Sequence, residues 1–320
     1  KKALDGGLDG LSVIRKVIKK SSELIKKNGK LLLEIGFDQK YKVEKILIID
    51  NFSTERYVTF INLKNRKKII FFDEDLINFD VKKIKNKIDC IIHLASTTNA
   101  EKSFSNKDKV LDHNLECTNK VLDLANKNTK IIFASSTSVY GSQYKIINSK
   151  NNQDNIFPQS PYAHSKILCE NLIKKGSNNY RIMRFGTIFG MSDGMRFHTA
   201  INKFCYQAAM GQKITIWKKF YKKKRPYLDL VDCVKSIIFC AFNDKIKNET
   251  LDVVTTNLKV IEIIKKIESI KKIKKLFVNT KILNQLSYEV QSDRLLNLNF
   301  RFRGDLFTSI KKTIKKLNIG

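Results

Sequence analysis

Residues 131–141 read IIFASSTSVYG, a short apolar run that ends in a cluster of hydroxyl side chains. The apolar part has the length of a buried strand, and similar runs occur at residues 46–50 (ILIID), 69–72, 90–94 and 130–134, with helical patterns between them. Strands that alternate with helices pair in parallel and are covered on both faces. We therefore expect an α/β fold with a doubly wound parallel sheet.

The pattern is less regular on either side of this region. Toward the N-terminus, residues 9–27 and 39–45 have apolar side chains at helical spacing, and residues 30–36 (KLLLEIG) are another apolar run of strand length. The C-terminal part mixes lysine-rich helices with further strand-like runs, which lie at 181–184, 214–217, 251–254 and 276–278. We expect three parts: an N-terminal segment at 1–45, a domain at 46–175 and a smaller domain at 176–320.

Composition excludes several classes of protein. The chain has 320 residues, is 42% hydrophobic and contains no apolar stretch of about 18 residues, so we expect a cytoplasmic protein and no membrane span. Its 6 cysteines form no CxxC pair, which predicts a reducing compartment and no metal site.

The net charge of +30 comes mostly from dispersed lysines, as codon bias in an AT-rich genome produces. Residues 218–225 (KKFYKKKR) are the nearest approach to a nucleic-acid patch, but we favour a solvated loop near an anionic substrate and expect no nucleic acid.

A candidate catalytic pair lies in PQSPYAHSK, residues 158–166. Tyr162 and Lys166 are four residues apart at the start of a helical pattern, so they share one face of a helix. An ammonium near a phenol stabilises the phenolate and lets the tyrosine exchange a proton near neutral pH. Spacing alone is weak support, since Tyr41 and Lys45 share it.

Ser136 is the third catalytic candidate. It follows a predicted parallel strand, and ligands of such sheets bind at the carboxyl ends of the strands. The alternative is that these hydroxyls form a turn or a helix cap.

Six segments together resemble one family. They are IDCIIHLAS (88–96), HNLECT (113–118), FASSTSVYG (133–141), QSPYAHSK (159–166), MRFGTIFG (183–190) and RPYLDLVD (225–232). In order and spacing they resemble extended short-chain dehydrogenases of the NAD-dependent epimerase/dehydratase family, which act on nucleotide sugars. The resemblance covers about residues 46–320 and implies a Rossmann-like NAD-binding domain followed by a substrate domain.

The resemblance implies a role for each matching residue. Tyr162 would be the acid/base, Lys166 would stabilise its phenolate and bind the nicotinamide ribose, and Ser136 would bond the reacting sugar hydroxyl. For NAD, the resemblance implies that Asp50 binds the adenosine ribose, that Asp75 and Leu76 contact the adenine, and that Leu94 and Ala95 lie beside the pyrophosphate. For the nucleotide sugar, it implies that Asn114 supports the site, that Thr187 lines the pocket and that Arg225 binds the phosphates. His93 is better explained as a side chain that fills the strand end.

The reaction implied is proton removal from a sugar hydroxyl by Tyr162 while hydride passes to NAD. Dehydratases of the family carry Asp-Glu where this chain has Thr137 and Ser138, so the resemblance favours a 4-epimerase or a reductase. Family members are usually dimers through a helix bundle, which implies a homodimer.

One family element is missing. The glycine-rich loop that brings backbone N–H groups to the pyrophosphate should precede Asp50, yet no glycine occurs between Gly36 and Gly141. Residues 1–45 instead resemble the C-terminal tail of release factor glutamine methyltransferases, without the motifs needed for methyl transfer. With Lys1 in place of a starting Met, this predicts a fragment or a fused reading frame, in which KLLLEIG takes a vacated edge of the sheet. The alternatives to a working enzyme are a non-catalytic sugar-nucleotide-binding or scaffold protein and a broken fused frame.

Overall fold

The computed structural model describes residues 31–33, 45–60, 66–84, 88–98, 100, 102–142, 146–148, 154–279 and 287–318. The helix expected at 9–27 and all but Lys45 of the one expected at 39–45 lie outside the described residues. The chain forms two compact units, each made of three segments. Unit 1 comprises Lys1–Ser135, Ser160–Met183 and Val234–Leu251, and unit 2 comprises Ser136–Gln159, Arg184–Cys233 and Asp252–Gly320. The expected division at 46–175 and 176–320 stays a prediction.

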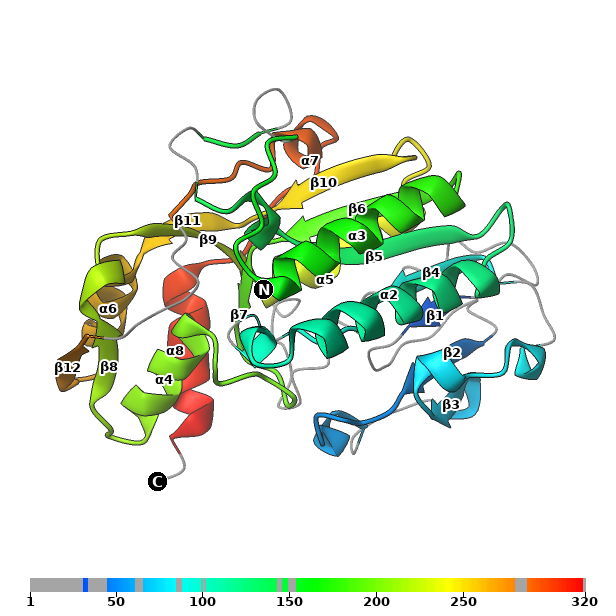
Figure 1. Cartoon of the computed structure of the whole chain (residues 1–320). Helices are drawn as coiled ribbons and strands as arrows, with labels where there is room; N and C mark the ends of the chain where they lie inside the picture. The colour runs from blue at the N-terminus through cyan, green and yellow to red at the C-terminus, as the bar shows by residue number, and fades with distance from the viewer. Residues whose placement is uncertain are drawn as a thin grey trace. The chain divides into compact units, whose positions relative to one another are not determined.

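A seven-stranded sheet has the order β10-β6-β5-β4-β1-β2-β3 (Figure 1). Its strands are β1 (Leu31–Leu33), β2 (Ile46–Asp50), β3 (Ile69–Asp73), β4 (Cys90–His93), β5 (Lys130–Ser136), β6 (Tyr180–Phe185) and β10 (Glu249–Val253). The pairs β1–β2, β1–β4, β2–β3 and β4–β5 are parallel. The order 3-2-1-4-5-6 is that of a doubly wound dinucleotide-binding sheet, so the expected α/β Rossmann-like fold is confirmed.

Strand β1 comes from KLLLEIG and lies inside the sheet, not at an edge. Leu32 is in register with Leu47 of β2 on one side and with Ile91 of β4 on the other. The expectation of an edge position was therefore wrong. Without a strand there, β2 and β4 would each leave a row of backbone N–H and C=O groups unpaired within the sheet, which is costly. Residues 31–33 of the N-terminal segment thus supply the first strand of this sheet.

Two helices of unit 1 pack against each other and cover the sheet. They are α2 (Lys107–Leu124) and α3 (Pro161–Gly176), which lie side by side in Figure 1. Apolar side chains recur along the inner face of α2 at helical spacing and join the core of this unit. That core includes Leu47, Ile49, Phe79, Ile91, Cys117, Val121, Ile131, Phe133, Cys169, Ile173 and Ile182.

The prediction of helices between β2 and β4 is wrong for the described residues of this region, which form only short 3-10 helices. These are η1 (Tyr57–Phe60), η2 (Arg66–Lys68), η3 (Leu76–Asn78) and η4 (Val81–Lys83). Asp75 caps η3 by accepting from Ile77 N, and Asp80 caps η4 by accepting from Lys82 N. Such local side-chain bonds compete with the formation of a longer helix.

Unit 2 holds two small sheets and several helices. One sheet has the order β11-β9-β7 and the other pairs β12 with β8; the strands are β7 (Thr187–Phe189), β8 (Ile214–Trp217), β9 (Lys224–Asp229), β11 (Thr256–Lys259) and β12 (Lys275–Val278). The core of this unit is formed with the amphipathic helices α4 (Ala200–Ala209), α6 (Val260–Glu268) and α8 (Leu306–Leu317). The other described elements belong to either unit. Those of unit 2 are α7 (Asp293–Asn297), η6 (Thr137–Tyr140) and η7 (Lys218–Phe220), η5 (Lys102–Phe104) belongs to unit 1, and α5 (Leu230–Phe242) begins in unit 2 and continues in unit 1. None of the described helices is both long enough and apolar enough to cross a membrane.

Candidate active site

Tyr162 lies in the first turn of α3, and the start of this helix is fixed by its sequence. Ser160 is the N-cap and accepts a hydrogen bond from Ala163 N at 3.1 Å, and Pro161 occupies the first turn, where its missing N–H costs nothing. The Tyr162 N–H donates to Ser103 Oγ at 3.3 Å. The backbone that carries the tyrosine is therefore held at both the cap and η5.

Lys166 lies one turn further along α3 and is buried. Its Nζ donates to the Ala134 carbonyl oxygen at 2.9 Å, and it lies 4.7 Å from the ring centre of Phe133 and 5.8 Å from that of Tyr162. A buried ammonium needs such partners, because desolvation without them is costly. The Lys166 ammonium therefore lies beside the Tyr162 ring in unit 1, and its role toward the phenol stays a prediction.

Asn114 is buried between α2, α3 and the end of β4. Its Oδ1 accepts from Thr97 N at 2.7 Å, and its Nδ2 donates to Thr97 O at 3.3 Å and to Ser165 Oγ at 2.9 Å. Ser165 Oγ in turn donates to Tyr162 O at 2.8 Å. These bonds use both donor and acceptor groups of the amide, which suits support of the Tyr162 backbone.

Ser136 belongs to unit 2 and caps η6. Its Oγ accepts from Ser138 N at 3.2 Å and from Ser138 Oγ at 2.9 Å. The helix-cap alternative considered for this serine is therefore realised in the structure. A hydroxyl has one donor and two acceptor sites, so a capping Ser136 retains the capacity to donate to a ligand.

Thr137, at the position where family dehydratases carry an acid, is buried in unit 2. Its Oγ1 donates to the Phe185 carbonyl oxygen at 3.2 Å and lies 3.2 Å from the Tyr288 hydroxyl. Burial raises the pKa of Tyr288 to about 12, and burial likewise raises that of Tyr227 to about 12. Both phenols stay protonated near neutral pH, and neither is suited to act as the base.

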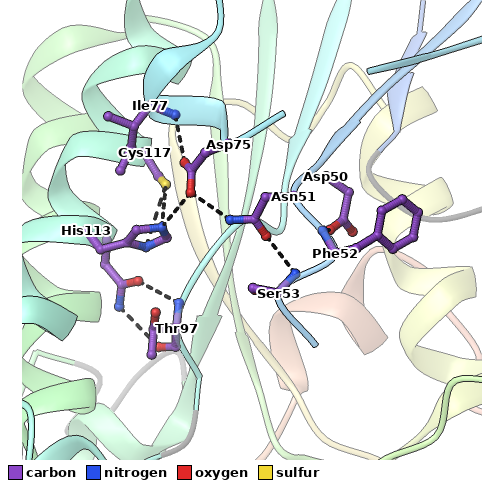
Figure 2. A network of polar contacts seen from close by, with 10 residues as sticks. Asp50, Asn51, Phe52, Ser53, Asp75, Ile77, Thr97, His113 and Cys117 are labelled. Atoms are coloured by element: carbon purple, nitrogen blue, oxygen red, sulfur yellow. Dashed lines mark hydrogen bonds and ion pairs between the residues drawn. The ribbon is translucent and has the colours of Figure 1, made fainter. Parts of the chain in front are cut away.

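The candidate cofactor carboxylates follow two neighbouring strands of unit 1 (Figure 2). Asp50 ends β2, and its Oδ1 accepts from Phe52 N at 2.8 Å; partial burial raises its pKa above the ordinary value, opposed by this bond and by Arg56. Asp75 follows β3 and accepts from Ile77 N. Both carboxylates lie at the carboxyl ends of parallel strands, where dinucleotides bind in folds of this type.

Asp75 carries further contacts that sequence reasoning missed. Its Oδ2 accepts from Asn51 Nδ2 at 2.6 Å and lies 3.5 Å from His113 Nε2. Partial burial acts against the charged form, but the bonds from Ile77 N and Asn51 and the nearby His113 ring hold the pKa of Asp75 below its ordinary value. The carboxylate is therefore fixed in orientation and favoured as an anion.

The apolar candidates line the same end of the sheet. Leu76 is buried, and Leu94 and Ala95 are half-buried directly after β4. His93 is buried with Nε2 3.1 Å from Thr118 Oγ1, and burial, with a smaller effect of Lys166, lowers its pKa to about 3. The ring is neutral at ordinary pH, in agreement with a packing role.

Thr187 and Arg225 are half-buried residues of unit 2 on neighbouring strands. Thr187 begins β7, opposite Tyr227 of β9, while Arg225 lies in β9, opposite Leu258 of β11. Unit 2 thus carries three of the expected residues, Ser136, Thr187 and Arg225. Unit 1 carries Tyr162, Lys166, Asn114 and the expected cofactor-binding residues.

The described residues do not include a glycine-rich loop that could bind the pyrophosphate of NAD. Residues 34–45 alone connect β1 to β2, and residues 34–44 lie outside the described part of the chain. A parallel crossover needs at least about 10–12 residues, so the connection is near the minimum length. Gly36 is its only glycine, which does not fit a GxxGxxG loop that admits phosphates to the backbone.

The strand order and the Tyr162/Lys166 pair agree with a comparison against known families. A model described as the NAD dependent epimerase/dehydratase family matches residues 42–253, more than half of the chain. The chain belongs to this family. Membership confirms the resemblance predicted from the six motifs, while the resemblance of residues 1–45 to methyltransferase tails stays a prediction.

Three similar proteins have descriptions that name a nucleotide-sugar epimerase. A protein of Bacillus subtilis described as an uncharacterized UDP-glucose epimerase YtcB is 26% identical over 246 residues, or 71% of this chain and 75% of that protein. UDP-glucuronic acid 4-epimerase from Bacillus cereus, solved with UDP-glucuronic acid and NAD, has a TM-score of 0.79 at 20% identity, covering 98% of this chain and 96% of that one. UDP-N-acetylglucosamine 4-epimerase from Methanobrevibacter ruminantium has a TM-score of 0.76 at 22% identity, covering 92% and 98%. At these identities the solved structures show the fold.

Proposed function

We propose that this family member is a nucleotide-sugar 4-epimerase or reductase that uses NAD. The observation that carries the proposal is the position of the buried Lys166 ammonium. It donates a hydrogen bond to the Ala134 carbonyl oxygen and lies 5.8 Å from the centre of the Tyr162 ring. A fixed cation beside a phenol stabilises the phenolate, so Tyr162 can take a proton from a sugar hydroxyl and return it. NAD, when bound, would accept and return the hydride.

The proposed binding roles follow the two units. In unit 1, Asp50 would bind the adenosine ribose, Asp75 and Leu76 the adenine, Leu94 and Ala95 the region of the pyrophosphate, and Lys166 the nicotinamide ribose. In unit 2, Ser136 would donate to the sugar hydroxyl, Thr187 would line the pocket and Arg225 would bind the phosphates. Asn114 would position the Tyr162 backbone through Ser165 and Thr97.

Supporting this substrate class, the relatives named above are described with UDP-glucose, UDP-glucuronic acid or UDP-N-acetylglucosamine. The absence of an acid at Thr137 and Ser138 argues against loss of water from the sugar.

We also propose a cytoplasmic homodimer that associates through the surface of α2 and α3. Light scattering on the purified chain would test the dimer, because it measures mass independently of shape.

Two measurements test the proposed function. Calorimetry with NAD should give binding in the micromolar range, and incubation with UDP-glucose, UDP-glucuronic acid or UDP-N-acetylglucosamine should give the 4-epimer by chromatography. Failure to bind NAD even at millimolar concentration would rule out catalysis by this chain.

A second candidate function is binding of a nucleotide sugar without turnover. It is favoured by one observation, the short connection between β1 and β2 with a single glycine. Under this hypothesis a uridine diphosphate sugar raises the melting temperature without NAD, and NAD itself has no effect. A broken reading frame predicts neither shift, together with poor folding.

A further inference from the structure

Three side chains of different types converge in unit 1, outside the Tyr162/Lys166 pair (Figure 2). His113 and Cys117 are four residues apart on α2 and therefore share one face of the helix. Asp75 approaches them from the N-cap of η3, which packs against α2. Among the described residues, these three form the group whose ligand atoms all lie within 4.8 Å of one another.

We propose that Asp75, His113 and Cys117 form a zinc site. The distances suit an ion of this size: Asp75 Oδ2 is 3.5 Å from His113 Nε2, which is 3.9 Å from Cys117 Sγ. Zinc bonds of about 2.0–2.3 Å in tetrahedral geometry place neighbouring ligand atoms about 3.3–3.8 Å apart. Cys117 Sγ is nearly equidistant from the two ring nitrogens, 3.8 Å from Nδ1 and 3.9 Å from Nε2, so the imidazole ring and the thiol would rotate toward each other for all three ligand atoms to bind one ion, with a fourth position left for water.

The chemistry of the ligands selects the metal. Thiolate and imidazole suit Zn²⁺, whereas Mg²⁺ and Ca²⁺ prefer sites made of oxygen ligands. A thiolate and a carboxylate together carry two negative charges, which balance the charge of Zn²⁺ locally in a chain whose net charge is +30. Asp75 and His113 have side chains that are 25% and 31% exposed, so an ion can reach them from solvent, while Cys117 is buried.

The surroundings hold the carboxylate as the outer shell of a metal site does. Ile77 N donates to Asp75 Oδ1 at 3.0 Å, and Asn51 Nδ2 donates to Oδ2 at 2.6 Å. Ile77 N thus bonds the oxygen that does not face His113, and Asn51 bonds the proposed ligand oxygen itself; such outer partners fix the orientation of a metal ligand, and losing them commonly lowers metal affinity 10- to 100-fold. In the competing explanation, Asp75 and His113 form only an ion pair and the cysteine packs beside it.

The consequence for the cofactor rests on the proposed function. Asp75 is the residue proposed to contact adenine, so zinc and NAD would compete for one carboxylate. Zinc would then weaken NAD binding in the wild-type chain. The zinc titration itself is done without NAD, so a failure of the metal site and a failure of the proposed function give different results.

The test uses the full chain after chelator treatment. Zinc is titrated against a chromogenic chelator, and cobalt is titrated to detect the thiolate-to-metal absorption band and the visible bands of four-coordinate Co²⁺. We expect the wild-type chain to bind one ion. Asp75→Asn and Cys117→Ser should each lower the affinity for the ion at least about tenfold, and Cys117→Ser should also lose the thiolate band. The matched controls are Cys205→Ser, another buried cysteine, and His198→Gln, an exposed histidine, which should both leave binding unchanged.

Two results would overturn the zinc site. One is an absence of zinc uptake by the wild-type chain, and the other is unchanged affinity in both ligand variants. Circular dichroism checks that Cys117→Ser folds; since Asp75 is partly exposed, Asp75→Asn keeps the test decisive even if the cysteine variant does not fold.

Discussion

Asn114 of α2 donates a hydrogen bond to the Ser165 hydroxyl of α3 at 2.9 Å, and both side chains are buried. The same amide bonds the Thr97 backbone after β4, and Ser165 bonds the carbonyl of Tyr162. One side chain thus ties the strand end that borders the proposed cofactor site to the helix that carries the proposed base. The position of Tyr162 depends on a residue that need not touch substrate.

Replacing Asn114 by alanine tests this link. The substitution removes the acceptor of the Thr97 N–H and the bond that Ser165 Oγ accepts, so the free energy of unfolding should fall by about 2 kcal/mol or more in denaturant titrations. Asn119→Ala, on the exposed face of the same helix, is the matched control and should change stability little. Equal stabilities of the two variants would contradict the assigned role.

Replacing Tyr162 by phenylalanine removes the proposed acid/base and keeps the ring near Lys166. If the wild-type chain turns over a UDP-sugar, kcat should fall by about 100-fold to 10,000-fold, the usual contribution of a positioned acid/base. The melting temperature should change little. Tyr57→Phe, at a tyrosine that is 55% exposed, is the control and should keep full activity. Retained turnover in Tyr162→Phe would exclude Tyr162 as the base.

His93 should make stability depend on pH. In the folded chain burial lowers its pKa to about 3, whereas the unfolded chain binds a proton near the ordinary value of 6.5. Below pH 6.5 the unfolded state therefore holds more protons, and the free energy of unfolding falls as the pH drops toward 3, by at most about 1.4 kcal/mol per pH unit. His93→Gln should flatten this part of the curve, and an unchanged pH dependence in this variant would contradict the assignment.

Strands β2 and β4 of the large sheet were predictable because nearly all of their side chains are buried, so each strand is a continuous apolar run. Predicted and observed bounds agree for residues 46–50 of this sheet and also for residues 214–217, which form β8 of the two-stranded sheet and alternate between buried and half-buried. Strands β7, β9 and β11 were not predicted. Strand β7 has only three residues, β9 begins with Lys224 and Arg225, and β11 is half-buried throughout, so none of the three is marked by a continuous apolar run of strand length.

The candidate site was predictable where its residues share one motif. Tyr162 and Lys166 are recognisable because a single helix turn sets their distance. The contacts of Asp75 with His113, and of Asn114 with Ser165, join segments that only the tertiary fold brings together. The spacing of His113 and Cys117 is a helical signal that was available in the sequence, but its third partner is not local.

Strand β1 leads to a prediction about the N-terminal segment. Leu32 lies opposite Leu47 on one side and Ile91 on the other. Because β1 has a paired strand on both sides, the backbone N–H of Leu32 faces a neighbouring strand in either direction. Leu32→Pro removes that donor from an interior strand and should prevent stable folding of unit 1, because proline is tolerated at edges and bulges only. Leu32→Val keeps the donor and favours a strand, so it should fold. Hydrogen exchange of the β2 and β4 amides measures the effect, and protection that persists in Leu32→Pro would show that residues 31–33 do not complete this sheet.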